Sequence, residues 1–140
     1  MAKVVKFGGS SLADANQFRK VADIIRSDKE RRYVVPSAPG KRFSDDVKVT
    51  DMLYTCYDMV KRGEDIDDYF GQIEKRYCEI ISDLGLDFDI SGELTYVKNA
   101  LRHRSGRDFA ASRGEYLNGL ILAKYLGYDF IDAENVIFFK

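Results

Sequence analysis

Residues 3–11, KVVKFGGSS, are the most informative segment for the architecture of this chain. A short run rich in β-branched residues stops at Gly8-Gly9, as a buried strand does, and two serines follow the glycines. Apolar residues then recur at helical spacing behind Asp14, a suitable N-cap, at Phe18, Val21, Ala22, Ile24 and Ile25. The order is therefore strand, tight turn, helix.

A second strand is predicted over residues 32–35, because this β-branched run ends at Pro36 and passes into a loop. Two strands separated by one helix favour a parallel βαβ unit. The middle of the chain shows apolar stripes at helical spacing, and two strand-like runs follow it. Helices are predicted at 49–60, 66–84, 94–101 and 109–126, and further strands at 128–132 and 136–139. The class is α/β with a helical insertion.

Length and charge restrict the classes of function. A chain of 140 residues can bury one ordinary core, so it forms one domain or part of one. The 22 Lys and Arg nearly balance the 23 Asp and Glu, which argues against a nucleic-acid footprint. No apolar stretch reaches the roughly 18 residues of a membrane helix, and no signal peptide is evident, so we expect a cytoplasmic protein. Cys56 and Cys78 are predicted to be packing residues.

The turn after the first strand is the sharpest candidate for a site. Gly8 and Gly9 let an anion approach the main chain beside a helix start. Lys6 stands in an apolar strand, where an ammonium needs a carboxylate or a phosphate as its partner. A nucleotide phosphate would serve. The alternative is a plain turn, with the serines capping a helix and Lys6 reaching the sheet edge. The Walker pattern is absent.

Two further segments carry polar groups suited to a small substrate. Ser37, with Lys41 beyond it, and Thr50 can bind a carboxylate, although helix capping and solvation explain them equally well. Gly114 costs roughly 1 kcal/mol in a helix interior, which suggests close approach by another backbone or a ligand. Glu115 would face that approach and accept from an ammonium group, or would simply be solvated. No metal site is predicted.

These segments together resemble the aspartate kinases. KFGGSS at 6–11, VVPSAPGKR at 34–42 with TDML at 50–53, and SRGEYLNGLILAKYLG at 112–127 match that family in order and spacing across nearly the whole chain. The resemblance implies an amino-acid kinase fold, a three-layer αβα sandwich of the carbamate kinase-like type. The chain would form the N-terminal portion of this fold, with a mostly parallel sheet and a helical insertion.

The resemblance also implies a reaction. The family transfers the γ-phosphoryl group of ATP to the β-carboxylate of L-aspartate and gives 4-phospho-L-aspartate, the first step toward lysine, threonine and methionine. ATP would come with Mg²⁺ held mainly by the nucleotide and by residues outside this chain. Lys6 would be catalytic by neutralising phosphoryl charge. The remaining roles implied are phosphate binding by Gly8, Gly9 and Ser10, and aspartate binding by Ser37, Thr50 and Glu115.

Members of this family are longer than residues 1–140. We therefore expect the N-terminal lobe only, without the second half of the kinase domain and the regulatory ACT domains, and with little activity by itself. The full-length protein is expected to be a homo-oligomer. Arg113 departs from the residues often found there and could alter substrate contacts. The alternatives are another amino-acid kinase, of glutamate or carbamate type, and a non-catalytic α/β folding or dimerisation fragment.

Overall fold

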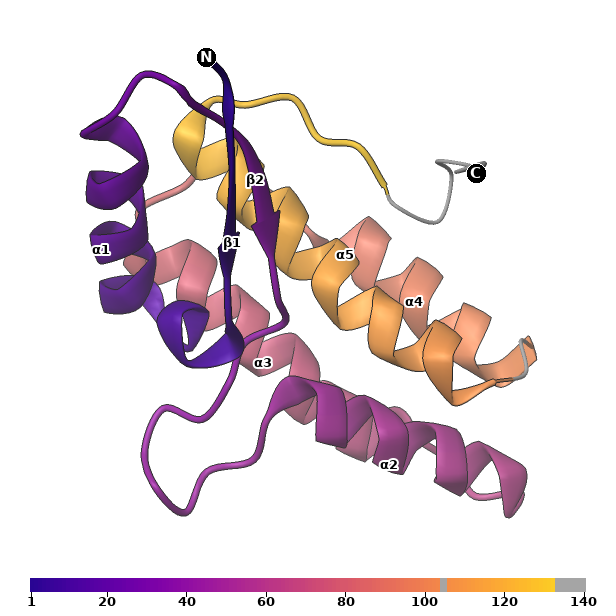
Figure 1. The fold of residues 1–140 in the computed structure, drawn as a ribbon. Helices are drawn as coiled ribbons and strands as arrows, with labels where there is room; N and C mark the ends of the chain where they lie inside the picture. Colours follow the sequence, from indigo (N-terminus) through magenta and orange to yellow (C-terminus); the bar gives the residue numbers. More distant parts are fainter. Residues whose placement is uncertain (104–105, 133–140) are drawn as a thin grey trace, which may run out of the picture.

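The computed structural model describes residues 1–103 and 106–132. Strands β1 (Lys3–Phe7) and β2 (Arg31–Pro36) pair in parallel, and α1 (Ala15–Arg26) connects them (Figure 1). The Asp14 side chain accepts a hydrogen bond of 3.0 Å from the backbone N–H of Gln17 and so caps α1. The predicted strand, turn, helix and parallel strand are confirmed.

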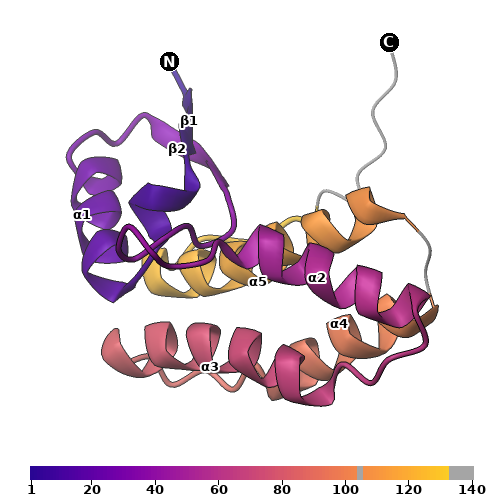
Figure 2. The ribbon, with the colours of Figure 1, turned by 90° about the horizontal axis from the view of Figure 1, so that it is seen from below.

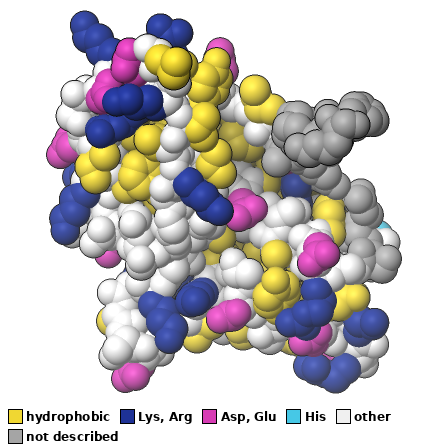
Figure 3. Space-filling view, viewed as in Figure 1, with side chains coloured by type: hydrophobic (Ala, Val, Ile, Leu, Met, Phe, Trp, Pro, Cys, Tyr) yellow, Lys and Arg dark blue, Asp and Glu magenta, His cyan; other side chains and the backbone are white. Residues whose placement is uncertain are grey.

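Within residues 1–103 and 106–132, the sheet has one covered face and one open face. Val5, Phe7 and Val34 pack against the core, whereas Val4 and Val35 are exposed. Side chains alternate along a strand, so each strand contributes to both faces. Figure 2 shows α1 and α5 on the same side of the strands, and Figure 3 shows apolar side chains gathered over the strands on the other side. The described elements thus form two layers at the sheet.

Four helices follow β2 in the sequence and include the predicted helical insertion. They are α2 (Val49–Lys61), α3 (Asp67–Asp83), α4 (Ser91–His103) and α5 (Arg107–Leu126). Gly63 and Gly127 follow α2 and α5 with φ of 77° and 76°, a conformation that ends a helix and favours glycine. In Figure 2, α3 and α4 lie on the far side of α2 and α5 from the strands. Among the described residues, no helix has both the length and the apolar character needed to cross a membrane.

The core lies where α2 and α5 cross. A Cβ added to Gly114 of α5 would lie 2.9 Å from Leu53 Cδ1 and 3.0 Å from Ala38 Cβ. The predicted close approach at this glycine is confirmed, and among the described residues the nearest neighbours are side chains and not another backbone. The buried Tyr77 hydroxyl donates 2.8 Å to the Gly114 carbonyl oxygen and adds α3 to the same junction. Burial raises the pKa of Tyr77, so this hydroxyl keeps its proton as a donor.

The strand predicted over residues 128–132 is wrong. Within the described residues, the only strand pairing is that of β1 with β2. Phe130 instead packs onto α5, where its Cε1 lies 2.7 Å from a Cβ placed on Gly119, and its ring meets Tyr116 edge-on at 5.7 Å between centroids. Side-chain packing on a helix therefore takes the place of a strand ladder. The strand predicted at 136–139 lies outside the described residues.

The two cysteines differ in their surroundings. Cys56 is fully buried, as predicted, and burial raises the pKa of its thiol to about 12. Cys78 is exposed on α3, so the prediction that it packs in the core is wrong. It lies on the solvent face because the neighbouring Arg76 and Tyr77 take the buried face of the helix. Both cysteines are free thiols.

Candidate functional site

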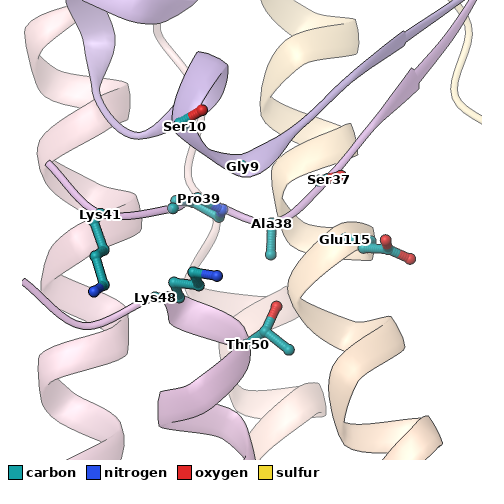
Figure 4. A pocket seen from close by; sticks show the side chains of 10 residues that line it. Gly9, Ser10, Ser37, Ala38, Pro39, Lys41, Lys48, Thr50 and Glu115 are labelled. Carbon is teal, nitrogen blue, oxygen red and sulfur yellow. The ribbon is translucent and has the colours of Figure 1, made fainter.

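A cavity of about 430 Å³ opens at the carboxyl ends of β1 and β2, where the turn after β1, the loop after β2, and helices α2 and α5 meet (Figure 4). Ligands in parallel α/β proteins collect at this end of the strands. The cavity is lined by Gly9, Ser10, Ser37, Ala38, Pro39, Gly40, Lys41, Lys48, Thr50 and Glu115. Five of the predicted site residues are therefore together around one space: Gly9, Ser10, Ser37, Thr50 and Glu115.

Two glycines bring the loops at this cavity into direct contact. Gly9 begins a 3-10 helix, η1 (Gly9–Leu12), and its carbonyl oxygen accepts 2.8 Å from the Gly40 N–H. A Cβ on Gly40 would lie 2.6 Å from the Gly9 carbonyl carbon, and a Cβ on Gly9 would lie 2.9 Å from the Ala38 carbonyl oxygen. No side chain fits between these backbones, so glycine is required at both positions. Gly8, with open space around it, does not line the cavity.

Lys6 is placed differently from the prediction. Its side chain is exposed, and it does not line the cavity. It makes no ion pair or side-chain hydrogen bond with the residues that the structure describes. The expectation of a buried ammonium in need of a partner is therefore wrong for the part of the chain that the structure describes, because there only one face of β1 is covered and Lys6 lies on the other. Lys6 is nevertheless in β1 directly before Phe7 and the Gly8-Gly9 turn.

Two lysines and one carboxylate determine the charge of the cavity. Lys41 and Lys48 both come from the loop after β2, and Glu115 comes from α5. Figure 4 shows Lys48 and Thr50 directed toward the loop that carries Ala38, and the Glu115 carboxylate directed outward from α5. The surplus of positive charge suits an anionic ligand. Sequence reasoning missed Lys48, although its place directly before the helix that holds Thr50 was a usable signal.

Side chains from the core hold the walls of the cavity. The buried Asn118 of α5 donates 2.8 Å from Nδ2 to the Ser37 carbonyl oxygen. Its Oδ1 atom is buried and has no hydrogen-bond partner among the described residues. Asn118 lies one helical turn after Glu115, so α5 supports Ser37 and presents Glu115 with the same segment.

Arg113 pairs with Asp132 and is not among the residues that line the cavity. Its side chain is 1% exposed and donates 3.2 Å to each carboxylate oxygen of Asp132. Its guanidinium carbon lies 4.7 Å from the centre of the Tyr116 ring. The expectation that Arg113 alters substrate contacts has no support in this placement, because Arg113 does not line the cavity.

The Asp46 carboxylate, in the loop after β2, should make the free energy of unfolding depend on pH. Bidentate hydrogen bonds of 2.7 and 3.0 Å from the Arg42 guanidinium hold the pKa of the Asp46 carboxyl well below its usual range. The stabilisation is complete above the unfolded value of about 4, and is lost as pH falls toward the lower folded pKa, because the unfolded chain takes up the proton first. We expect the free energy of unfolding in urea to fall between pH 5 and pH 3. Asp46→Asn should flatten this dependence, and an equally steep fall in that variant would contradict the assignment.

The described residues offer little to a metal ion. They hold no group of three or more His, Cys, Asp or Glu side chains with suitable geometry. Glu115 is the only carboxylate in the cavity lining. Hard cations such as Mg²⁺ prefer several oxygen ligands, so these residues alone do not fit a magnesium site.

The sheet, the glycine turn and the cavity define an α/β protein with a polar cavity at the carboxyl end of its first strand. Residues 1–139 match the family model described as the amino acid kinase family, and the chain belongs to this family. The predicted family fold is thereby confirmed. The predicted resemblance to aspartate kinases is confirmed as well by individual relatives.

The relatives are aspartokinases from bacteria and plants. Aspartokinase 3 of Bacillus subtilis is 35% identical over 96% of this chain and 31% of its own length. The crystal structure of Clostridium acetobutylicum aspartate kinase is 57% identical with a TM-score of 0.88, over 91% of this chain and 30% of that one. Escherichia coli aspartokinase III, solved with aspartate and ADP, is 25% identical with a TM-score of 0.70, over 91% and 29%. The chain thus spans about 30% of the length of these relatives.

Proposed function

We propose that residues 1–140 are the N-terminal lobe of an aspartate kinase, which transfers the γ-phosphoryl group of ATP to the β-carboxylate of L-aspartate. The observation that carries the proposal is the convergence of Ser10, Ser37, Thr50 and Glu115, from four separate segments, on one cavity beside the glycine turn. A relative of the same fold was solved with aspartate and ADP, which supports the same ligand classes here.

The groups around the cavity suit aspartate. The Glu115 carboxylate accepts hydrogen bonds from the α-ammonium group of the substrate. The hydroxyls of Ser37 and Thr50 donate to a substrate carboxylate, and Lys48 supplies a compensating charge. Replacing the acidic substrate by a neutral amino acid would leave the lysines without their counter-charge, so the cavity selects a dicarboxylic amino acid.

The phosphoryl group transfers without a protein nucleophile. A β-carboxylate oxygen of aspartate forms the bond to the γ-phosphorus, the bond from that phosphorus to the bridging oxygen breaks, and ADP leaves with the electron pair. The Gly9 and Ser10 N–H groups and the Lys6 ammonium stabilise the charge that spreads over the phosphoryl oxygens, and Gly8 leaves their approach open. Such catalysis depends on positioning and charge, which this set of residues can supply.

The other functions of the enzyme would lie in the part of the relatives that this chain does not span. That part would supply the adenosine pocket, further ligands for a nucleotide-bound Mg²⁺, and regulatory ACT domains, and residues 1–140 alone would have little activity. The complete protein would be a cytoplasmic homo-oligomer that starts the route to lysine, threonine and methionine. The near-balance of 22 basic and 23 acidic residues agrees with a small-molecule substrate and not a nucleic acid.

A chimera tests the proposal. Residues 1–140 would replace the matching segment of the Clostridium acetobutylicum enzyme, whose structure they match with a TM-score of 0.88. We expect ATP-dependent phosphorylation of aspartate by the chimera and little by residues 1–140 alone. Phosphorylation of glutamate or carbamate in place of aspartate would establish the other amino-acid kinase alternative. Absence of any activity, with no NMR shift of the Gly9 amide on adding ATP or aspartate to the 140-residue chain, would favour the inert fragment.

Glu115→Gln in the chimera should weaken aspartate binding specifically. The amide keeps the size of the side chain but removes the negative charge that faces the ammonium group, so we expect the KM for aspartate to rise about 10- to 100-fold. The KM for ATP should change much less. Glu93→Gln, on α4 and outside the cavity lining, is the matched control. An unchanged aspartate KM in Glu115→Gln would remove the ammonium contact from the proposal.

A further inference from the structure

Arg76 is a buried cation that sequence reasoning missed. It lies on α3, and its side chain is 5% exposed. Among the described residues, Arg113 is the other buried charged residue. Its guanidinium donates to three backbone carbonyl oxygens, at 3.0 Å to Val47, 3.2 Å to Ala13 and 2.8 Å to Gly40. The Asp46 carboxylate, 3.6 Å away, provides the counter-charge.

The three carbonyl groups belong to the segments that build the cavity. Ala13 directly follows η1, which contains Gly9 and Ser10. Gly40 lines the cavity and donates its own N–H to Gly9. Val47 precedes Lys48, another lining residue. One guanidinium therefore connects the segment that follows the glycine turn to both ends of the loop from Gly40 to Lys48.

Arginine suits this task better than other side chains. Its planar guanidinium has five N–H donors in a fixed geometry, so it can bond several carbonyl groups that lie in different directions. A lysine in the same place has a single nitrogen on a flexible stem. The side chain does not line the cavity, so it has no direct access to a ligand there.

We propose that Arg76 is a positioning residue for phosphoryl transfer. It holds Gly40 against Gly9 and thereby sets the spacing between the glycine turn and the loop from Gly40 to Lys48. The inference rests on the proposed function. Phosphoryl transfer depends on alignment, and a displacement of about 1 Å can lower the rate about 100-fold. Loss of the Arg76 bonds should thus affect kcat more than the KM for aspartate, since Ser37 and Glu115 are held by α5 and its Asn118.

The kinetic test uses the chimera described above with Arg76→Met and Arg76→Lys. We expect kcat to fall about 100-fold in Arg76→Met and about 10-fold in Arg76→Lys, with the aspartate KM changed by less than about threefold in either. This graded rescue is expected because lysine keeps the charge and part of the bonding. Lys75→Met, at the neighbouring position, is the matched control. The Lys75 side chain is 78% exposed, and its only ion-pair partner among the described residues is Glu79. Unchanged kcat in folded Arg76→Lys and Arg76→Met would overturn the proposal.

A second measurement keeps the inference separate from the proposed function. In the 140-residue chain, hydrogen exchange of the Gly40 amide, which bonds to Gly9, should become at least about tenfold faster in Arg76→Lys and remain unchanged in Lys75→Met. Amides in the middle of α5 should keep their rates in both variants. If the unsubstituted chimera lacks aspartate kinase activity, the proposed function fails, and the exchange result decides the positioning of Gly40 by itself. An unchanged Gly40 rate in Arg76→Lys would then overturn the role of Arg76.

Discussion

Lys6→Ala in the chimera is expected to lower kcat about 10²- to 10³-fold, with much less effect on the KM for aspartate. The ammonium lies on the open face of β1 just before the glycine turn, and it has no ion-pair partner among the described residues. It is therefore available to a phosphoryl group. A charge placed where negative charge develops matters most in the transition state, so its loss lowers kcat.

The exposure of Lys6 makes this a clean experiment. In the 140-residue chain, where Lys6 is exposed and has no ion-pair partner among the described residues, the substitution should change the free energy of unfolding by only about 0.5 kcal/mol, so destabilisation of this segment would not explain a loss of kcat in the chimera. Lys3→Ala is the matched control, because Lys3 lies in the same strand but its side chain pairs with Asp28 at 2.6 Å. Near-normal turnover in Lys6→Ala would exclude Lys6 from phosphoryl transfer. The measurement is steady-state kinetics with ATP and aspartate varied separately.

Local signals in the sequence predicted most of the fold. The parallel βαβ unit follows from β-branched runs interrupted by Gly8-Gly9 and Pro36, and the Asp14 cap lies where the periodicity of α1 begins. Helix ends at Gly63 and Gly127 are recognisable because glycine at these positions adopts positive φ. Each of these features depends on a few neighbouring residues, and for that reason a single sequence reveals them.

Features that depend on tertiary contact were missed or wrong. Arg76 looks like an ordinary charged residue of an amphipathic helix, and nothing near it in sequence indicates that it meets the carbonyl groups of Ala13, Gly40 and Val47. The apolar run around Phe130 resembles a strand, but packing against Gly119 of α5 overrides the local preference. The apolar run around Lys6 predicts a buried side chain, but a short run of this kind does not reveal whether one or both faces of its sheet are covered.

The same distinction applies to the candidate site. Gly9, Ser10, Ser37, Thr50 and Glu115 were predicted from their residue types and from segments that resemble a known family, and the cavity brings them together. Lys48 and Asn118 complete the cavity and its support, but neither belongs to a pattern with an evident chemical meaning. Residue types that bind ligands are thus more predictable than the groups that hold them in place.

Gly40→Ala is expected to damage both folding and activity. The added methyl group would lie 2.6 Å from the Gly9 carbonyl carbon and 2.8 Å from the Ser10 backbone nitrogen, and neither backbone atom can rotate away. The two loops must therefore separate, which breaks the 2.8 Å hydrogen bond from Gly40 to Gly9. We expect the free energy of unfolding, measured in urea, to fall by about 1–3 kcal/mol. In the chimera, kcat should fall about 100-fold, because the glycine turn moves relative to the rest of the site.

Gly71→Ala separates this effect from the general consequences of replacing glycine. Gly71 lies inside α3 with open space around its Cα, so alanine meets no atom there and removes the entropic cost of glycine in a helix. The expected result is a gain of about 0.5–1 kcal/mol in the free energy of unfolding with unchanged kcat. If Gly40→Ala lowers the free energy of unfolding while Gly71→Ala raises it, the effect at Gly40 comes from contact between the loops and not from the flexibility of glycine. If Gly40→Ala unfolds with the same midpoint as the unsubstituted chain and keeps full turnover, the close contact with Gly9 does not exist in solution, and the cavity must be built differently.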